Sequence, residues 1–114
     1  MDGIAAVIIN KALDGLALRA QATAQNIAAA GSRDFRPVQV KFEDSLRAAA
    51  LQGDDAVRDL SFGMTAVPAS PLGSEPRLDL ELATASETAL RYQALLDVLG
   101  RQMQIARTVV RGGQ

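Results

Sequence analysis

The chain has 114 residues and carries 12 lysines and arginines against 13 aspartates and glutamates, a formal net charge of -1. It contains neither cysteine nor histidine, which excludes disulfides, thiol catalysis, a Ser-His-Asp triad and zinc sites built on those residues. The balanced charge also argues against nucleic acid as a partner, because nucleic-acid-binding proteins usually carry a strong basic excess.

Proline positions divide the sequence into three zones. Hydrophobic residues make up 48% of the chain and aromatic ones only 4%, and much of the apolar content is alanine, which favours helices. Residues 1–30 and 79–114 contain no proline, whereas all four prolines lie within 31–78. We therefore expect a mainly all-α protein with an N-terminal helix in 1–30, an irregular middle segment in 31–78 and a C-terminal helix in 79–114.

The N-terminal zone has the spacing of a coiled-coil helix. Apolar residues recur at alternating steps of three and four, which is the heptad pattern of a helix that packs against other helices. This stripe consists of Ala6, Ile9, Leu13, Leu16, Ala20, Thr23, Ile27 and Ala30, and Val7, Ile8 and Leu18 widen it.

The C-terminal zone repeats the heptad pattern. Its main stripe is Leu82, Ala85, Ala89, Tyr92, Leu96, Leu99, Met103, Ala106 and Val110. A second apolar stripe beside it contains Leu90, Leu95, Val98, Ile105 and Val109. We expect Asp79 to be the N-cap of this helix and Gly112-Gly113 to end it, with arginines in the last turns opposing the negative end of the helix dipole.

The middle zone predicts only short elements. Val38, Val40 and Phe42 alternate with polar residues, which is typical of a short extended piece. Residues 42–51 predict a short helix that ends near Gly53, and 61–76 reads as a long loop. We interpret the adjacent carboxylates Glu43-Asp44 and Asp54-Asp55 as solvated groups and not as a metal or acid–base site.

Helix length and the surplus apolar stripes together predict assembly. Helices of about 29 and 32 residues are roughly 43 and 48 Å long, too long for a compact chain of this size, so we expect an elongated antiparallel coiled-coil hairpin. Pairing the two helices hides one stripe of each and leaves the other exposed, and large exposed apolar patches usually mark binding surfaces. We therefore expect the isolated chain to be marginally stable and to be completed by neighbours.

Two segments resemble the bacterial flagellar axial proteins, the family of rod and hook subunits. Residues 24–32, Ala-Gln-Asn-Ile-Ala-Ala-Ala-Gly-Ser, are similar to the Asn-Ile-Ala stretch near the end of the family's N-terminal helix. Residues 89–96, Ala-Leu-Arg-Tyr-Gln-Ala-Leu-Leu, are similar to a segment typical of the proximal-rod members. Arg33-Asp34 stands where the family commonly has Pro-Gly.

This resemblance implies a structural subunit of the flagellar basal-body rod, exported without a cleaved signal peptide and assembled in the periplasm. The implied partners are copies of the chain, other rod subunits, and the membrane-ring and export-gate proteins at the base of the rod. No cofactor, metal or small-molecule substrate is expected. The predicted subunit-interface residues are Ile9, Leu13, Leu16, Ala20, Asn26, Ile27, Arg91, Tyr92, Gln93, Leu96, Leu99, Met103, Ala106 and Val110.

A second class of function stays open beside the rod subunit. A soluble helical adaptor or export-regulating protein would bind one partner in a helix-in-groove mode. An adaptor needs one binding stripe, whereas a subunit of a tube needs surplus stripes at both ends. An enzyme is disfavoured, because the sequence has no histidine, no cysteine and no convergent cluster of polar residues.

Overall fold

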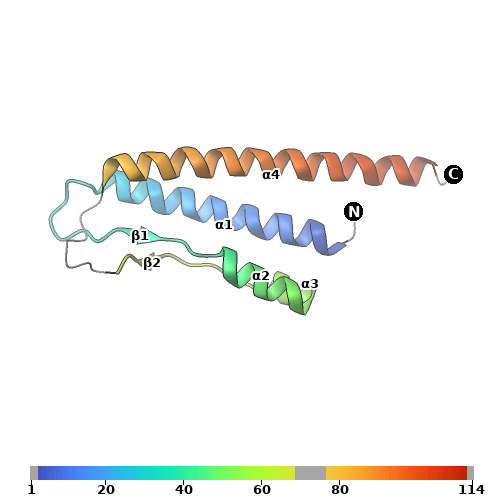
Figure 1. Cartoon of the computed structure of the whole chain (residues 1–114), viewed down its shortest axis with the longest axis horizontal. Helices are drawn as coiled ribbons and strands as arrows, with labels where there is room; N and C mark the ends of the chain where they lie inside the picture. Colours follow the sequence, from blue (N-terminus) through green and yellow to red (C-terminus); the bar gives the residue numbers. More distant parts are fainter. Residues whose placement is uncertain (1–2, 69–76, 113–114) are drawn as a thin grey trace.

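The computed structural model describes residues 3–68 and 77–112, and the molecule is elongated. It measures 64 × 27 × 16 Å with a radius of gyration of 17.7 Å, against about 13–14 Å for a compact chain of this length. The elements are α1 (Gly3–Ala28), β1 (Val38–Gln39), α2 (Glu43–Gln52), α3 (Asp54–Asp59), β2 (Thr65–Ala66) and α4 (Leu78–Gly112). The prediction of a mainly α-helical hairpin with two long terminal helices is confirmed (Figure 1).

Helix α1 is the central layer of the molecule. Figure 1 shows α4 running antiparallel along one side of α1, while β1, α2, α3 and β2 lie along its other side. Because α4 has 35 residues and α1 has 26, the C-terminal end of α4 projects past the start of α1. One helix is therefore covered from two sides, and the longer helix from only one.

The hydrophobic core lies between α1 and the middle segment. Among the described residues, α1 contributes Leu13, Leu16 and Ala22 to the buried apolar set, and the middle segment contributes Val40, Phe42, Leu46, Ala49 and Val57. The buried set contains no apolar residue of α4, whose buried residue is Thr88. The sequence predicted that the two long helices hide one apolar stripe of each against one another, whereas the fully buried apolar residues lie mainly between α1 and the middle segment.

A glycine in α1 makes room for the largest core side chain. A Cβ atom added at Gly15 would lie 2.6 Å from Cγ of Phe42 and 2.7 Å from both Cδ atoms, so the ring packs directly on the helix backbone. The Phe42 ring also contacts the ring of Phe62, with centroids 5.4 Å apart in a tilted arrangement. The close approach of Phe42 to Gly15 fixes where the middle segment sits along α1.

The middle segment returns along α1 as a two-stranded connection with two short helices at its far end. Strand β1 pairs antiparallel with β2, with Val38 opposite Ala66 and Gln39 opposite Thr65. The turn before β1 places Asp34 at φ 67°, in the left-handed region that aspartate tolerates better than most residues. The turn is thus made without the Pro-Gly pair that the axial family commonly has there.

Three local expectations need correction or extension. The helix predicted at 42–51 is confirmed as α2, but a further helix that was not predicted, α3, begins at Asp54 and Asp55. There they face the positive end of the helix dipole and pair with Arg58, at 3.0 and 3.5 Å respectively. The loop expected at 61–76 contains β2, and its residues 69–76 lie outside the described part of the chain.

The start of α4 also differs from the expectation. The helix begins at Leu78, so Asp79 lies in the first turn and is not the N-cap. The N–H of Glu81 donates to the carbonyl of Arg77 at 3.0 Å, and the Arg77 side chain donates to the Asp79 carboxylate at 3.0 Å. That hydrogen bond from Arg77 is the main cause that lowers the pKa of Asp79. At its other end α4 is described as far as Gly112, and Gly113 lies outside the described residues.

The packing of Phe42 on Gly15 can be tested through the free energy of unfolding. Gly15→Ala should lower the free energy of unfolding by about 1–3 kcal/mol, because the added methyl group overlaps a buried ring, although alanine is the better helix former. Gly100→Ala is the matched control: its Cβ would meet nothing within 4 Å, so it should raise the free energy of unfolding by about 0.5–1 kcal/mol. Urea unfolding followed by circular dichroism measures both; stabilisation by Gly15→Ala would contradict the packing.

Candidate assembly surface

Asn26 holds the first strand against α1. Its side-chain Nδ2 donates to the carbonyl of Val38 at 2.8 Å, and its Oδ1 accepts from the N–H of Val38 at 2.9 Å. The same Nδ2 donates to the Glu81 carboxylate of α4 at 3.1 Å, and Asn26 is only 2% exposed. One amide therefore satisfies both backbone groups of a strand residue, as a neighbouring strand would, and links α1, β1 and α4.

Arg19, two helical turns before Asn26, holds the next part of the middle segment. Its guanidinium donates to the carbonyl of Val40 at 2.7 and 3.2 Å and to both oxygens of the Glu43 carboxylate at 2.8 and 2.7 Å. The guanidinium carbon also lies 4.7 Å from the centre of the Phe42 ring. The paired geometry suits the planar fork of arginine and would not be reproduced by lysine.

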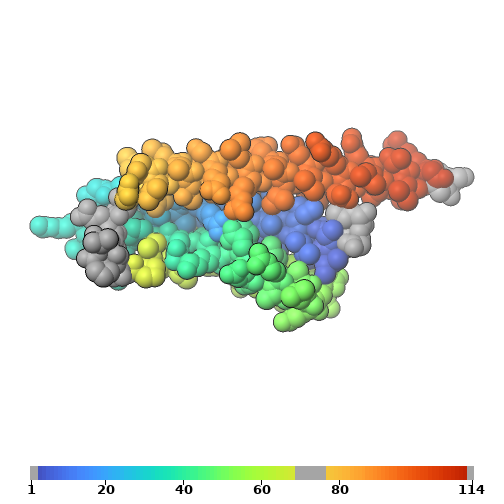
Figure 2. Space-filling model, viewed as in Figure 1, coloured from blue at the N-terminus to red at the C-terminus, as the bar shows by residue number. Residues whose placement is uncertain are grey.

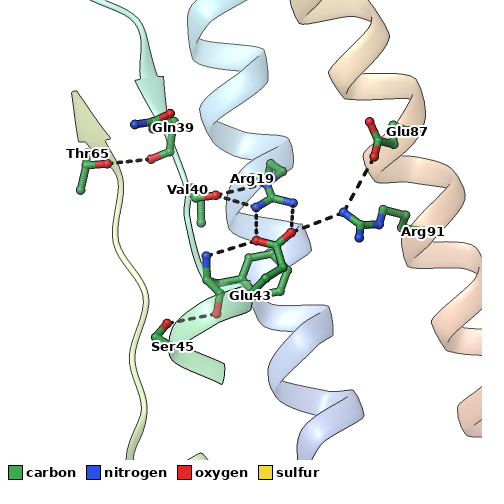
Figure 3. A network of polar contacts seen from close by, with 9 residues as sticks. Arg19, Gln39, Val40, Glu43, Ser45, Thr65, Glu87 and Arg91 are labelled. Atoms are coloured by element: carbon green, nitrogen blue, oxygen red, sulfur yellow. Dashed lines mark hydrogen bonds and ion pairs between the residues drawn. The ribbon is translucent and has the colours of Figure 1, made fainter. Parts of the chain in front are cut away.

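Glu43 connects this network to α4. Arg91 of α4 lies 3.4 Å from the Glu43 carboxylate and 3.9 Å from Glu87, so one carboxylate at the start of α2 is shared by arginines of both long helices (Figure 3). The hydrogen bonds from Arg19 lower the pKa of Glu43 from 4.5 to about 2. The network positions α1, α2 and α4 relative to one another, and it leaves the outer surface of α4 uncovered.

That outer surface is unusually apolar. Among the described residues, eleven large hydrophobic side chains are exposed, and ten of them belong to α4. Those ten are Leu78, Leu80, Leu82, Leu90, Leu96, Val98, Met103, Ile105, Val109 and Val110. Figure 2 shows α4 forming one long edge of the molecule, with its far end projecting from the body.

Helix geometry sorts most of these side chains into two flanks. The line of α4 that faces α1 contains Thr88, Tyr92, Leu95 and Leu99, which are buried or half-buried. With 3.6 residues per turn, one flank beside this line contains Leu78, Leu82, Ala89, Leu96 and Met103. The other flank contains Leu80, Val98, Ile105 and Val109. An assembly of helices would thus meet apolar surface on both sides of the α1–α4 pair.

Each flank of α4 has a groove beside it, and the two grooves differ in their walls. The first has a volume of about 460 Å³ and lies between α1, α2 and α4, with Ile8, Leu46 and Leu95 in its walls and Arg47 and Arg91 among its polar lining residues. The second has a volume of about 440 Å³ and lies between α1 and α4 alone. Small side chains line the second groove, chiefly Ala17, Ala20, Ala24, Ala85 and Ala89. Such a lining lets another helix approach closely.

The predicted interface residues fall into three groups. Leu13, Leu16 and Asn26 are buried inside this chain, so their side chains are used in its own packing. The half-buried group is Ile9, Ile27, Tyr92 and Leu99, which lie along the α1–α4 pair. The exposed group is Ala20, Arg91, Gln93, Leu96, Met103, Ala106 and Val110, of which Arg91 is already paired with Glu43 and Glu87. The interface role itself stays a prediction for all of them.

Sequence reasoning missed the residues that position this surface. Gly15 and Arg19 were not singled out, and Glu43 was expected to be a solvated carboxylate but accepts hydrogen bonds from Arg19 with both oxygens. Arg19 and Asn26, seven residues apart, share one face of α1. The second stripe of the C-terminal zone already contained Val98, Ile105 and Val109, which form most of one exposed flank. Helical periodicity found the apolar surface but not its polar supports.

The described residues contain neither a metal-binding cluster nor a membrane-spanning helix. Within 3–68 and 77–112 no group of three or more acidic, histidine or cysteine side chains is arranged to hold a metal ion. In the same ranges, none of the helices has the length and apolar character needed to cross a bilayer. Neither a scan against models of protein families nor a search of curated proteins finds a match to this chain.

The lowered pKa of Glu43 predicts acid sensitivity. A carboxylate whose pKa is lower in the folded state adds stability above its unfolded pKa, and this stability is lost as pH falls from about 4.5 to about 2. Because the Glu43 side chain is 40% exposed, solvent screening reduces this contribution to about 1–2 kcal/mol. Glu43→Gln should remove that part of the acid-induced loss of unfolding free energy.

Urea unfolding at neutral and acid pH measures this effect. Asp44→Asn is the matched control, because Asp44 is adjacent, 99% exposed and paired only loosely with Arg47 at 3.5 Å. The control should lose as much stability in acid as the unmodified chain. Equal acid losses for the unmodified chain and for Glu43→Gln would contradict the assigned role of the network.

Proposed function

We propose that this chain is a structural subunit of the bacterial flagellar basal-body rod, of the proximal-rod kind represented by FlgB. The observation that carries the proposal is the exposed apolar surface of α4, which extends from Leu78 to Val110 and flanks α1 on both sides. Monomeric soluble proteins rarely expose large apolar patches, and ten large hydrophobic side chains of α4 are exposed. The sequence resemblance at 24–32 and 89–96 supports the flagellar assignment.

The proposed mechanism is mechanical. Helices of neighbouring subunits pack into the apolar flanks of α4, and many small contacts between interlocked side chains add up to torsional stiffness. The polar network of Arg19, Glu43 and Arg91 keeps the middle segment fixed against the helices, so that load passes through a defined body. The middle segment would supply the contacts specific to one position in the rod.

The proposed setting follows from the same resemblance. The chain would be exported without a cleaved signal peptide and would join the rod in the periplasm. Its partners would be copies of itself, other rod subunits, and the membrane-ring and export-gate proteins at the base of the rod. The elongated shape, 64 Å along its longest axis, suits a subunit whose helices lie side by side with those of its neighbours.

The helical adaptor is the rival proposal, and the two grooves favour it. Each groove has apolar walls of the kind that receives one helix of a partner. An adaptor would leave most of the projecting end of α4 uncovered, however, since the α4 residues that line the two grooves all lie within 85–95. A rod subunit covers both flanks and the projecting end, and the rod proposal therefore accounts for more of the exposed surface.

Substitution of Ile105 tests the rod proposal. Ile105 is 51% exposed in the isolated chain, so Ile105→Asp should leave the thermal unfolding temperature nearly unchanged. In the bacterium that encodes the chain, the same substitution should prevent an epitope-tagged copy from purifying with basal bodies and should abolish swimming, because it buries a charge in a helix contact.

Leu51→Asp is the matched control. Leu51 is also exposed, at 87%, but it lies at the end of α2 and not on α4. This variant should still be recovered with basal bodies. If the unmodified chain is absent from purified basal bodies, the rod proposal is wrong; if Ile105→Asp is incorporated normally, the α4 flank is not the contact surface.

A further inference from the structure

One flank of α4 repeats with the period of a two-stranded coiled coil. Leu82, Ala89, Leu96, Met103 and Val110 recur every seven residues and extend over 29 positions, roughly 42 Å of helix. Leu96, in the middle, is 39% exposed and the leucine, methionine and valine on either side are more exposed. The spacing is symmetrical about Leu96, so the stripe presents the same pattern when read in either direction.

The charge on α4 is not symmetrical. Its first fifteen residues, 78–92, contain Asp79, Glu81, Glu87 and one arginine, a net charge of -2. Its last fifteen residues, 98–112, contain three arginines and no acidic residue, a net charge of +3. A partner that lies along α4 therefore meets net negative charge at the start of the helix and net positive charge at its end, although the charged side chains are spread around the helix and are not confined to this flank.

A second copy of α4, lying antiparallel, has the complementary distribution of charge. We propose that two copies of this chain pair through the stripe, with Leu96 facing its own copy across a twofold axis. Leu82 then faces Val110 of the second copy, and Ala89 faces Met103. The acidic start of each helix lies along the basic end of the other, within the distance over which charges interact at physiological salt.

The groove between α1 and α4 fits this arrangement. Met103 of the second copy lies beside Ala89, at the edge of the groove lined by Ala20, Ala24 and Ala85. A long, flexible methionine side chain fills a shallow, small-residue groove well. Gly100, next to the stripe, has nothing within 4 Å of its Cβ position, which leaves room for close approach of a second helix.

Other arrangements of the two copies are less favourable. A parallel pair would place net negative starts together and net positive ends together, which is repulsive along the whole contact. An antiparallel twofold pair covers both stripes in one closed contact and leaves no complementary surface for open-ended growth through that flank. The opposite flank, with Val98 and Ile105, remains uncovered in the pair.

The absence of cysteine makes the geometry directly testable. Leu96→Cys introduces the only thiol in the chain, and mild oxidation of the purified variant should convert most of it to a disulfide-linked dimer, because the two residues meet at the axis. Leu82→Cys should not link to itself, but an equimolar mixture of Leu82→Cys and Val110→Cys should form the mixed dimer. Linkage of Leu82→Cys to itself would show a parallel pair and overturn the proposal.

Sedimentation equilibrium of the cysteine-free chain tests the same pairing without a disulfide cross-link. The double variant Arg107→Glu with Arg111→Glu should weaken dimerisation about tenfold or more at low salt, and the difference should shrink as salt is raised. Arg33→Glu with Arg36→Glu is the matched control, because both residues are exposed and belong to the turn before β1 and not to α4, and it should dimerise normally. Unchanged dimerisation of the first variant would overturn the charge argument.

The dimerisation experiments and the basal-body experiment test separate proposals. The pairing rests on the stripe and on the charge of α4, not on the flagellar assignment, and it is measured on purified protein. A chain that stays monomeric at high concentration and gives no Leu96→Cys dimer overturns the pairing and assigns the stripe to a different protein. Recovery of the chain with basal bodies, in contrast, depends on neither result.

Discussion

The packing of the Phe42 ring against Gly15 is the constraint on which the rest of this structure depends. It lets an aromatic ring pack directly on the backbone of α1, and Arg19 covers that ring while it holds the carbonyl of Val40 and the carboxylate of Glu43. The middle segment is thereby fixed to one face of α1, with the core between them. Since that face is occupied, α4 packs on another side of α1, where α1 supplies most of its contacts and α2 meets it through the Glu43–Arg91 ion pair and the groove they share.

This one-sided arrangement explains why the two long helices differ so strongly. Helix α1 is enclosed between two layers and contributes six buried residues, whereas α4 contributes Thr88 within the described part of the chain. A helix of 35 residues with so little burial has few tertiary contacts of its own to stabilise it, particularly at its projecting end. In the proposed assemblies, contacts with other chains would supply the free energy that orders this end.

Periodicity predicted the long helices and the apolar stripes, because heptad spacing over many turns is a local pattern that packing rarely overrides. The helix at 42–51 was predicted for the same reason. The placement of the core was not, since it depends on a missing side chain at Gly15 meeting a ring 27 positions away. Asn26 and Arg19 were equally hard to interpret, because they bond to backbone groups of Val38 and Val40 and to carboxylates distant in the sequence, and backbone groups leave no signature in the sequence.

The two flanks of α4 also suggest how a helix with exposed apolar surface avoids uncontrolled self-association. A helix that is apolar on both sides would form open chains if both flanks bound copies in the same way. Charge that changes sign along α4 restricts one flank to an antiparallel partner, and the other flank lies beside the groove that Arg47 and Arg91 line. If the chain is a rod subunit as proposed, exchange of the closed pair for rod neighbours would require that the neighbours offer the same complementary charge over a larger apolar area, which would favour assembly where those neighbours are already in place.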